Sequence, residues 1–308
     1  MNSLHQSVDE YLSVRRHLGF KLERAGHLLP NFASYMEEAA TLTVTIDLAL
    51  AWAKQPADGS AGWWQERLST VRGYVRHLHG IDPSHQILPG GLLPKGSHRV
   101  SPHIYSQDEI LRLMNAARSF VTDLRAATYA TLIGLLVTTG LRPGEAIHLD
   151  RSDIDWDQGI LSIRLTKFGK SRELVLHPTT VDALRRYDDV RARWCPRPRT
   201  PAFFVSAIGA RLRHDTLNHG FRKLVKRAGL EPESGVRRPR PHDLRHTFAV
   251  NTLVGWYRNG LEINSKMYLL STYLGHSHPA DTYWYVSATS ELLGLATERL
   301  EAAQGAGS

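Results

Sequence analysis

The sequence predicts a mainly α-helical protein with a small β-sheet in its second half, preceded by an all-α helical domain. Apolar residues recur at helical spacing through most of the chain. Alternation of apolar and polar residues, which is typical of strands, appears at residues 159–165 and 172–177. The length of 308 residues exceeds the usual size of one hydrophobic core, so we expect two domains.

The first domain, residues 1–87, is expected to be mostly helical. Its clearest helix is WWQERLSTVRGYVRHLHG, residues 63–80, in which apolar residues line one side. The other side carries three arginines, Arg67, Arg72 and Arg76. A solvated surface explains this stripe about as well as DNA binding does, and only its agreement with the second half of the chain favours DNA binding.

Residues 88–103 are predicted to be a basic interdomain linker. They contain glycines and prolines at a density that no helix or strand tolerates. Lys95 and Arg99 lie in this segment, where a basic tether can follow a DNA backbone. We therefore count both among the candidate DNA contacts.

The second domain is expected to cover residues 104–300, followed by a flexible tail at residues 301–308. Ser106 with Glu109 is a capping signal for a first helix, and the apolar segment 127–140 predicts a long helix that ends on its glycine. The two alternating segments flank TKFGKS and predict a hairpin. Further helices are expected at residues 216–229, 242–257, 265–275 and 287–303.

Composition favours a cytoplasmic protein with a polyanionic partner. Lys and Arg total 38 against 30 Asp and Glu, and Lys or Arg that neutralise phosphates release condensed counterions. Cys195 is the only cysteine, which excludes an internal disulfide and a thiolate metal cluster. We find no signal peptide and no apolar stretch near the about 20 residues that a bilayer requires, so no membrane partner is expected.

Four patches of the second domain carry residues suited to chemistry. They are TGLRPGE, TKFGKS, PHDLRHTFA and YLGHSHPADTYWYVSAT. Each patch alone is ambiguous, because a surface arginine or a hairpin lysine is usually only a solvated side chain. Together they supply two arginines that can hold a phosphate, two histidines that can move protons, and a lysine that can protonate a leaving alkoxide. They also supply a tyrosine whose phenolate is favoured by cationic neighbours.

In this order the patches resemble the boxes of the tyrosine recombinases of the phage integrase family. LRPGE is similar to the first arginine box, which implies a catalytic role for Arg142 and an acidic supporting role for Glu145. TKFGKS is similar to the hairpin lysine box and points to Lys167, with Lys170 as the alternative if the register differs.

The remaining boxes resemble the end of the family's catalytic domain. HDLRHTFA is similar to the H-x-x-R box, which implies catalytic roles for His242 and Arg245. LGHS supplies His276, and Tyr285 follows nine residues later at the spacing that the family expects for its nucleophile. This spacing favours Tyr285 over Tyr283. The resemblance covers about 200 residues, and residues 1–87 resemble the family's helical core-binding domain more weakly.

The resemblance implies a site-specific DNA recombinase or integrase that needs neither a metal ion nor ATP and has no cofactor. Tyr285 would attack a DNA phosphate to form a 3′-phosphotyrosine intermediate, with His242 as base and Lys167 as acid for the departing 5′-oxygen. The partners implied are a double-stranded recombination site, further copies of the chain as a dimer on each site and a tetramer in synapsis, and companion recombinases. A mobile genetic element is the preferred role, because Arg245 and His276 are 31 positions apart, a longer segment than the family's compact pattern.

Other interpretations stay open from the sequence. A catalytically inactive DNA-binding accessory protein of the same fold would share the helical domains. A topoisomerase would share the residues and differ in assembly. A metal-dependent nuclease would use His242 and His246, which are four positions apart and can bind zinc from one helix face, but the glutamate of H-E-x-x-H is absent.

Overall fold

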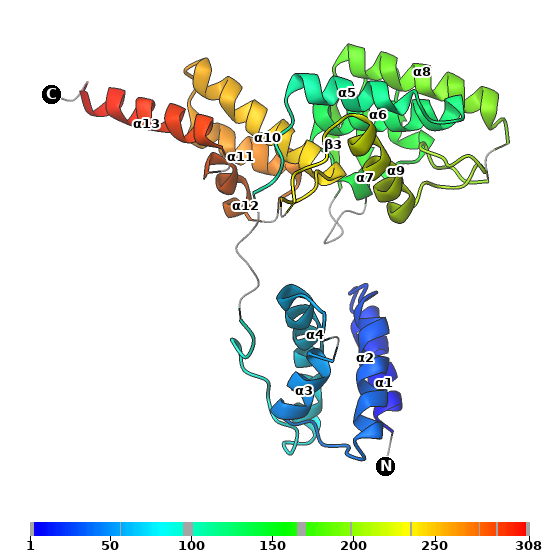
Figure 1. The fold of residues 1–308 in the computed structure, drawn as a ribbon, viewed down its shortest axis with the longest axis vertical. Helices are drawn as coiled ribbons and strands as arrows, with labels where there is room; N and C mark the ends of the chain where they lie inside the picture. Colours follow the sequence, from blue (N-terminus) through cyan, green and yellow to red (C-terminus); the bar gives the residue numbers. More distant parts are fainter. Residues whose placement is uncertain are drawn as a thin grey trace. The chain divides into compact units, whose positions relative to one another are not determined.

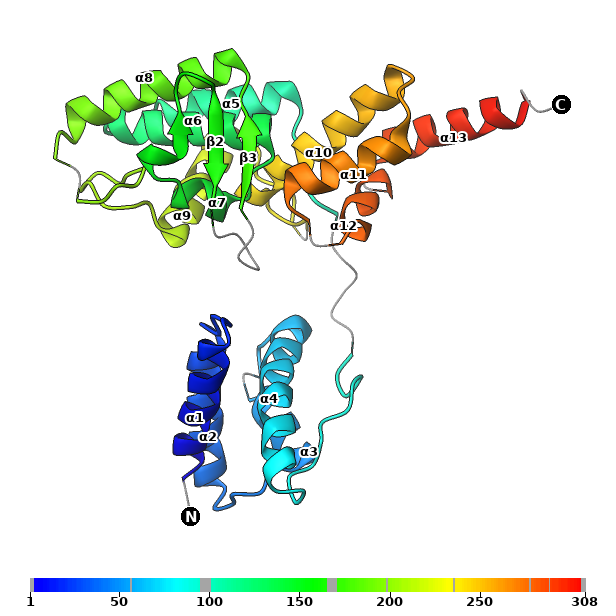
Figure 2. The same cartoon turned by 180° about the vertical axis from the view of Figure 1, so that it is seen from behind.

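The computed structural model describes residues 3–55, 57–94, 101–164, 171–197, 199–234, 236–276, 278–287 and 289–305. The chain divides into two compact units, Met1–Val100 and Ser101–Ser308, and this division falls inside the predicted linker. Figure 1 and Figure 2 show the helices and strands of both units from opposite sides. Among the described residues, no helix is both long enough and apolar enough to cross a membrane.

The described residues of the first unit, 3–55 and 57–94, form four helices. They are α1 (Leu4–His17), α2 (Ala25–Glu38), α3 (Ile46–Ala53) and α4 (Ala61–Ile81). Ser3, Thr45 and Ser60 cap the first, third and fourth helices by accepting a backbone N–H of the first turn. The buried side chains of these helices form one core, in which the rings of Phe32 and Trp52 meet edge to face at 5.1 Å.

Residues 88–94 contain no helix or strand, yet they pack on this first unit. Leu88 and Leu93 are buried in its core. Arg72 of α4 donates from Nε to the carbonyl of Leu88 at 3.1 Å and from Nη2 to that of Pro89 at 3.0 Å. The part of the predicted linker that the structure describes here is therefore anchored to α4.

The second unit contains most of the secondary structure. Its helices are α5 (Gln107–Ala117), α6 (Asp123–Thr139), α7 (Pro143–His148), α8 (Pro178–Trp194), α9 (His214–Arg227), α10 (Pro241–Arg258), α11 (Ile263–Leu274), α12 (Ala280–Tyr283) and α13 (Ser290–Gly305), with short 3-10 turns η1 (Arg151–Asp153) and η2 (Trp284–Ser287). Strands β1 (Ile154–Asp155), β2 (Ile160–Ile163) and β3 (Arg172–Val175) form one antiparallel sheet in the order β1-β2-β3.

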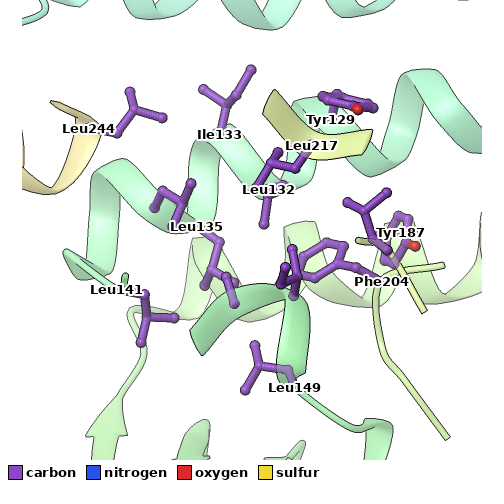
Figure 3. Close-up of a cluster of buried hydrophobic side chains, with 14 of the residues drawn as sticks. Tyr129, Leu132, Ile133, Leu135, Leu141, Leu149, Tyr187, Phe204, Leu217 and Leu244 are labelled. Carbon is purple, nitrogen blue, oxygen red and sulfur yellow. The ribbon is translucent and has the colours of Figure 1, made fainter. Parts of the chain in front are cut away.

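The core of the second unit surrounds α6, which packs against α5, α8 and α10. Figure 3 shows side chains of α6, including Leu132 and Leu135, beside Tyr187 of α8 and Phe204. The inward residues of the sheet, Leu161 and Leu174, join the same cluster. This core supports the turn between α6 and α7, from which the first candidate catalytic residue projects.

A second cluster lies at the end of the unit away from α8, where Figure 1 and Figure 2 show α10, α11, α12 and α13 together. It contains Leu253 of α10, Leu270 of α11, Tyr285 of η2 and Leu292 of α13. The first part of α13 therefore packs on α10 of its own chain, and the helix continues to Gly305, inside the segment predicted as a flexible tail. This cluster holds the segment that carries the candidate nucleophile.

These elements confirm the predicted fold class, a mainly helical chain with a small sheet. Helix α6 ends on Gly140, and Ser106 and Glu109 form the predicted capping box of α5. Strands β2 and β3 are the two predicted arms of the hairpin. Strand β1 and helix α8 were not predicted, and the segment between Arg245 and His276 is occupied by most of α10, a short turn and α11.

Candidate active site

Arg142 projects from the junction of α6 and α7. Gly140 ends α6 with a φ of 61°, and a Cβ atom there would collide with Phe248 and lie 2.9 Å from Leu274. Only glycine allows the chain to turn at this point. Arg142 is then the N-cap of α7, and its backbone N–H donates to Glu145 at 3.0 Å. The turn fixes the direction in which the Arg142 side chain leaves the core.

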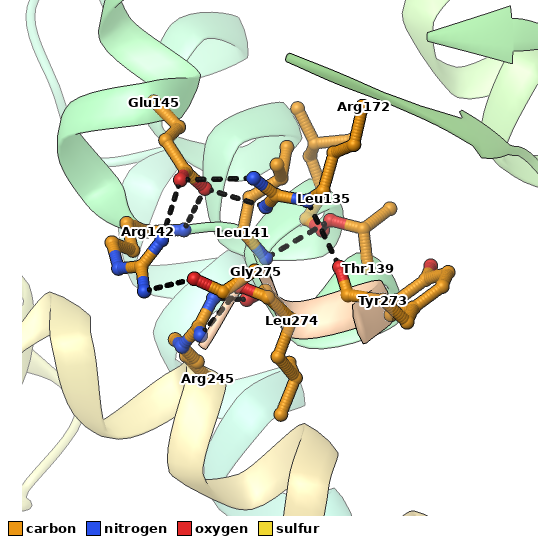
Figure 4. A network of polar contacts seen from close by, with 11 residues as sticks. Leu135, Thr139, Leu141, Arg142, Glu145, Arg172, Arg245, Tyr273, Leu274 and Gly275 are labelled. Atoms are coloured by element: carbon orange, nitrogen blue, oxygen red, sulfur yellow. Dashed lines mark hydrogen bonds and ion pairs between the residues drawn. The ribbon is translucent and has the colours of Figure 1, made fainter. Parts of the chain in front are cut away.

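Glu145 bridges two arginines, as Figure 4 shows. Its carboxylate accepts hydrogen bonds from Arg142 Nη1 at 2.8 Å and from Arg172 Nη1 and Nη2 at 3.1 and 2.8 Å. Burial alone would raise the pKa of Glu145, but the hydrogen bonds and charge of Arg172 and the hydrogen bonds from Arg142 lower it to about 2. Glu145 is therefore ionised at neutral pH and orients both guanidinium groups.

The carboxyl end of α11 is held by three arginines that come from three different parts of the chain (Figure 4). Each donates to one of three consecutive backbone carbonyls. The pairs are Arg172 Nε with Tyr273 at 2.9 Å, Arg245 Nη2 with Leu274 at 2.7 Å, and Arg142 Nη2 with Gly275 at 2.9 Å. The last carbonyls of a helix have no partner within the helix and carry its partial negative charge, so cations stabilise them. This end of α11 thereby sets the spacing between the guanidinium groups.

Arg245 is 1% exposed and connects the ends of two helices. Besides its contact to α11, its Nη1 donates to the carbonyl of Gly140, the last residue of the α6 cap, at 2.8 Å. Desolvation and the nearby charge of Arg142 lower the pKa of Arg245 to about 10. Arg245 remains protonated at neutral pH, and each guanidinium has five N–H donors, so further donors remain for a phosphate.

Tyr285 lies in η2 and is 2% exposed. Its hydroxyl is 3.1 Å from Nδ1 of His246, and its ring stacks on that of His276 with ring centres 6.1 Å apart. The spacing of nine residues between His276 and Tyr285 thus brings the two rings together. The Tyr285 side chain therefore lies beside two imidazole rings, and its hydroxyl is within hydrogen-bonding distance of the His246 ring.

His276 follows the glycine that ends α11 and is held by Thr282. Its Nδ1 lies 2.7 Å from the hydroxyl of Thr282, which is fully buried at the start of the tyrosine segment. Gly275 has a φ of 68°, and a Cβ atom there would lie 2.9 Å from Nη1 of Arg172. His276 is therefore attached both to the arginine cluster and to the segment that carries the tyrosine.

His242 occupies the first turn of α10 and is exposed. Its ring meets that of His246, one turn further along, edge to face at 4.9 Å. Although part of the His242 side chain is open to solvent, desolvation of the remainder and the positive charges of Arg245 and Arg142 lower its pKa to about 4, against the effect of Asp243. His242 is therefore neutral at pH 7 and can accept a proton, whereas an anionic phosphate bound beside it would raise its pKa.

Some predicted site residues lie elsewhere or outside the described residues. Lys167 and Lys170 belong to residues 165–170, between β2 and β3, which lie outside the described residues. Lys95 and Arg99 belong to residues 95–100, which also lie outside them. Catalytic and DNA-binding roles for these four residues stay predictions.

The arginine stripe of the first unit separates into different environments. Arg67 is 6% exposed, donates to the carbonyl of Trp52 at 2.8 Å and lies 3.8 Å from the centre of the Trp52 ring. Arg72 holds the residues after α4, as described above. Arg76 is exposed. DNA binding by these residues stays a prediction, and Arg76 is the exposed one of the three.

Three residues of the site were not assigned a role from the sequence. Arg172 begins the second arm of the hairpin, where strand alternation alone gave it no function. His246 was considered only as a metal ligand, and Thr282 was not considered. Sequence spacing could have pointed to His246 and Thr282. His246 follows His242 by four residues, and Thr282 follows His276 by six.

The metal-site interpretation has no support among the described residues. Within that part of the chain, no group of three or more His, Cys, Asp or Glu side chains is arranged to hold a metal ion. His242 and His246 instead meet edge to face, beside the buried guanidinium of Arg245.

With this geometry established, comparison with known proteins identifies the family. The model of the "Phage integrase family" matches residues 104–291. The chain belongs to the phage integrase family. The match includes every residue of the site described above.

The relative "Putative integrase/recombinase y4rB" of Sinorhizobium fredii is 42% identical over 307 residues, covering 98% of each chain. Among solved structures, the Tn1549 transposon integrase in complex with transposon right end DNA is similar with a TM-score of 0.67 and 17% identity, covering 97% of this chain and 100% of that one. A lambda integrase dimer bound to a core site is similar with a TM-score of 0.60 and 20% identity, covering 90% and 96%.

These similarities confirm the fold class and the enzyme class. This phage integrase family member is an enzyme of the tyrosine recombinase family. The predicted resemblance is therefore confirmed at the level of the family.

Proposed function

We propose that this enzyme cuts and rejoins double-stranded DNA at specific sites through a 3′-phosphotyrosine at Tyr285. The observation that carries the proposal is the set of contacts at the end of α11. Arg142 and Arg245 converge on carbonyls that directly precede His276, whose ring stacks on Tyr285. The two arginines proposed to bind the phosphate and the proposed nucleophile thus all contact residues 274–276.

The chemistry follows from the groups in this site. Arg142 and Arg245 hold non-bridging phosphate oxygens and stabilise the charge that develops during transfer. His276 donates a further hydrogen bond to the phosphate. The Tyr285 oxygen forms a bond to phosphorus while the bond to the DNA 5′-oxygen breaks, so the energy of the phosphodiester is retained in the phosphotyrosine.

Proton transfer at the two oxygens completes each step. In the proposed reaction the phenol proton passes to the histidines of α10, of which His242 is neutral at pH 7. Lys167 donates a proton to the 5′-oxygen as it leaves. Attack by a 5′-hydroxyl of another cut strand reverses these transfers and exchanges strands.

Helix α9 supplies a second surface suited to DNA in the catalytic unit. Its buried side holds Leu217, Phe221, Leu224 and Val225, and its exposed side holds Arg222, Lys223, Lys226 and Arg227. The first residue of α9, His214, packs against Gly144 of α7, which begins directly after Arg142. The exposed basic side chains of α9 are therefore further candidates for contacts with a DNA backbone.

We further propose that the enzyme acts as an oligomer for a mobile genetic element. The lambda integrase structure is a dimer on its core site, and the Tn1549 integrase binds a transposon end. Both proteins share the fold, and the relative y4rB carries an integrase/recombinase name. A dimer on each DNA site and a tetramer in synapsis follow from pairing two such sites.

A covalent trapping experiment tests the nucleophile. The full chain is incubated with a pool of nicked duplexes that carry a randomised centre, and adducts are isolated in denaturing detergent and sequenced. Wild type should retain the 5′-labelled fragment, as a 3′-phosphotyrosine requires. The variant Tyr285→Phe should form no adduct, whereas Tyr283→Phe should react like wild type, because Tyr283 is 49% exposed and lies outside the site.

Two results would contradict the proposal. Adduct formation by Tyr285→Phe would exclude Tyr285 as nucleophile. Specific binding by wild type with no adduct on any nicked duplex would instead identify a DNA-binding accessory protein.

A further inference from the structure

The histidine within hydrogen-bonding distance of the Tyr285 hydroxyl is His246, whereas the family resemblance implied His242 as the base. It is on α10 directly after Arg245 and one turn beyond His242. Its Nδ1 is 3.1 Å from the hydroxyl oxygen of Tyr285, which is hydrogen-bonding distance. His246 therefore contacts the phenol oxygen directly, and the His242 ring packs against the His246 ring.

The surroundings of His246 fix its ring between the nucleophile and the solvent side of the site. Its ring centre is 4.9 Å from that of His242, 5.4 Å from that of Tyr285 and 5.6 Å from that of Trp284. His246 is partly buried, whereas His242 is exposed. The order from the interior outward is therefore Tyr285, His246, His242.

We propose that His246 is a catalytic residue that takes the proton of Tyr285 directly during cleavage and returns it during rejoining. The inference rests on the proposed function of Tyr285 as nucleophile. His242, on the outer side, passes the proton between His246 and solvent. This arrangement gives the buried phenol a route to water through two side chains of one helix.

The proton and electron balance of this step is closed within the site and its DNA. His246 accepts at Nδ1, so it begins as the tautomer with its proton on Nε2. The O–H bond of Tyr285 breaks as its oxygen bonds to phosphorus, and the proton moves to Nδ1. The bond from phosphorus to the 5′-oxygen breaks, and this oxygen takes a proton from Lys167. In the reverse reaction the 5′-hydroxyl attacks, and the imidazolium of His246 returns a proton to the departing phenolate.

The variant His246→Asn separates proton transfer from positioning. An asparagine amide reaches the position of Nδ1 and can still hydrogen-bond the phenol, but it cannot take up a proton at neutral pH. We expect the single-turnover rate of covalent adduct formation on a nicked duplex to fall by about 10²–10⁴-fold, the usual contribution of a general base. His148→Asn is the matched control, because His148 is an exposed histidine of the same unit.

The second arm replaces Tyr285 with 3,5-difluorotyrosine, whose phenol is more acidic and needs less help from a base. The ratio of the wild-type rate to the His246→Asn rate should then shrink by at least about tenfold if His246 removes the proton. Thermal unfolding and mobility shift of the variants check that the fold and DNA binding persist.

Each outcome decides between the alternatives. A rate for His246→Asn equal to or above wild type would overturn the inference, since His246 would then only hold the buried tyrosine. An equal loss with tyrosine and with difluorotyrosine would also overturn it, because that result indicates positioning alone. If wild type forms no adduct, the proposed function itself fails, and this result is distinct from both.

Discussion

Replacement of Arg172 by methionine tests the arginine cluster most directly. Arg172→Met keeps much of the volume but removes the charge, both hydrogen bonds to Glu145 and the bond to the Tyr273 carbonyl. The side chains of Arg172 and Glu145 are 13% and 8% exposed, so solvent screens their interaction weakly. A buried carboxylate would lose its bidentate partner and retain only Arg142.

The pKa of Glu145 sets the size of the effect. Its fall from an ordinary value of 4.5 to about 2 corresponds to about 3 kcal/mol of stabilisation of the carboxylate. Arg142 supplies part of this, while the unpaired Tyr273 carbonyl adds about 1 kcal/mol to the loss. We therefore expect Arg172→Met to lower the free energy of unfolding of the catalytic unit by about 2–4 kcal/mol at pH 7.

The sign of the pH dependence follows from the lowered pKa. The contribution of Glu145 to stability is fully present above pH 4.5 and is lost as pH falls toward 2. Arg172→Met lacks most of this contribution at every pH. The difference in stability between wild type and variant should therefore shrink as pH falls from about 4.5 toward 2.

Hydrogen exchange in increasing urea, read on peptides of α6 and α11, measures the stability of the catalytic unit in the full chain. The matched control is Arg151→Met, because Arg151 also forms a bidentate pair, with Asp188, but its side chain is 59% exposed. We expect this control to cost at most about 1 kcal/mol. Equal losses in both variants, or a loss for Arg172→Met that is the same at pH 3 and pH 7, would refute the reasoning.

Three further predictions concern other contacts. Thr282→Val should reduce the single-turnover rate of adduct formation by about tenfold, since it removes one hydrogen bond that orients His276, and Thr282→Ser should restore it; an unchanged rate for the valine variant would contradict this. Arg67→Met should destabilise the first unit by about 2–3 kcal/mol in hydrogen exchange, because it removes the contacts to Trp52. Arg76→Met should leave stability unchanged, but it should reduce the slope of log affinity for DNA against log salt concentration by about one. A loss of stability in Arg76→Met, or a changed salt slope with unchanged stability in Arg67→Met, would contradict our assignment.

Candidate site residues could be named from the sequence where chemistry and spacing coincide. Arg142, His242, Arg245, His276 and Tyr285 were proposed because each lies in a short box with a recognisable order, and their catalytic roles stay predictions. The glycine before the first box was predicted to end a helix, and its positive φ explains why. These features are local. Because residues close in sequence determine them, they can be predicted from the sequence.

Contacts that depend on tertiary packing were not predictable in the same way. Arg172 appeared only as a strand residue, because its partners Glu145 and Tyr273 are 27 and 101 positions away. Arg67 appeared to belong to a surface stripe, but the Trp52 ring that covers it comes from another helix. The spacing of single side chains gives no information about such distant partners.

Helix α8 is a different case, since its pattern was present in the sequence. Its buried residues Thr180, Leu184, Tyr187 and Arg191 follow helical spacing, but they include a threonine and a charged side chain. Arg191 is buried because it donates to the carbonyl of Ala202 at 2.9 Å. A pattern based on apolar residues alone therefore understates this helix.

The three carbonyls at the end of α11 also affect how the enzyme can be redesigned. Because the guanidinium groups of Arg142, Arg172 and Arg245 are bonded to one rigid helix end, a shift of α11 along its axis acts on all three together. Residues 259–262, which join α10 to α11, are thus a single adjustable point for the whole arginine cluster. Insertions there should change all three arginine contacts together and thereby weaken or abolish the proposed strand cleavage. Exchange of one arginine box between related enzymes would instead leave the carbonyls at the end of α11 without a matching set of arginines.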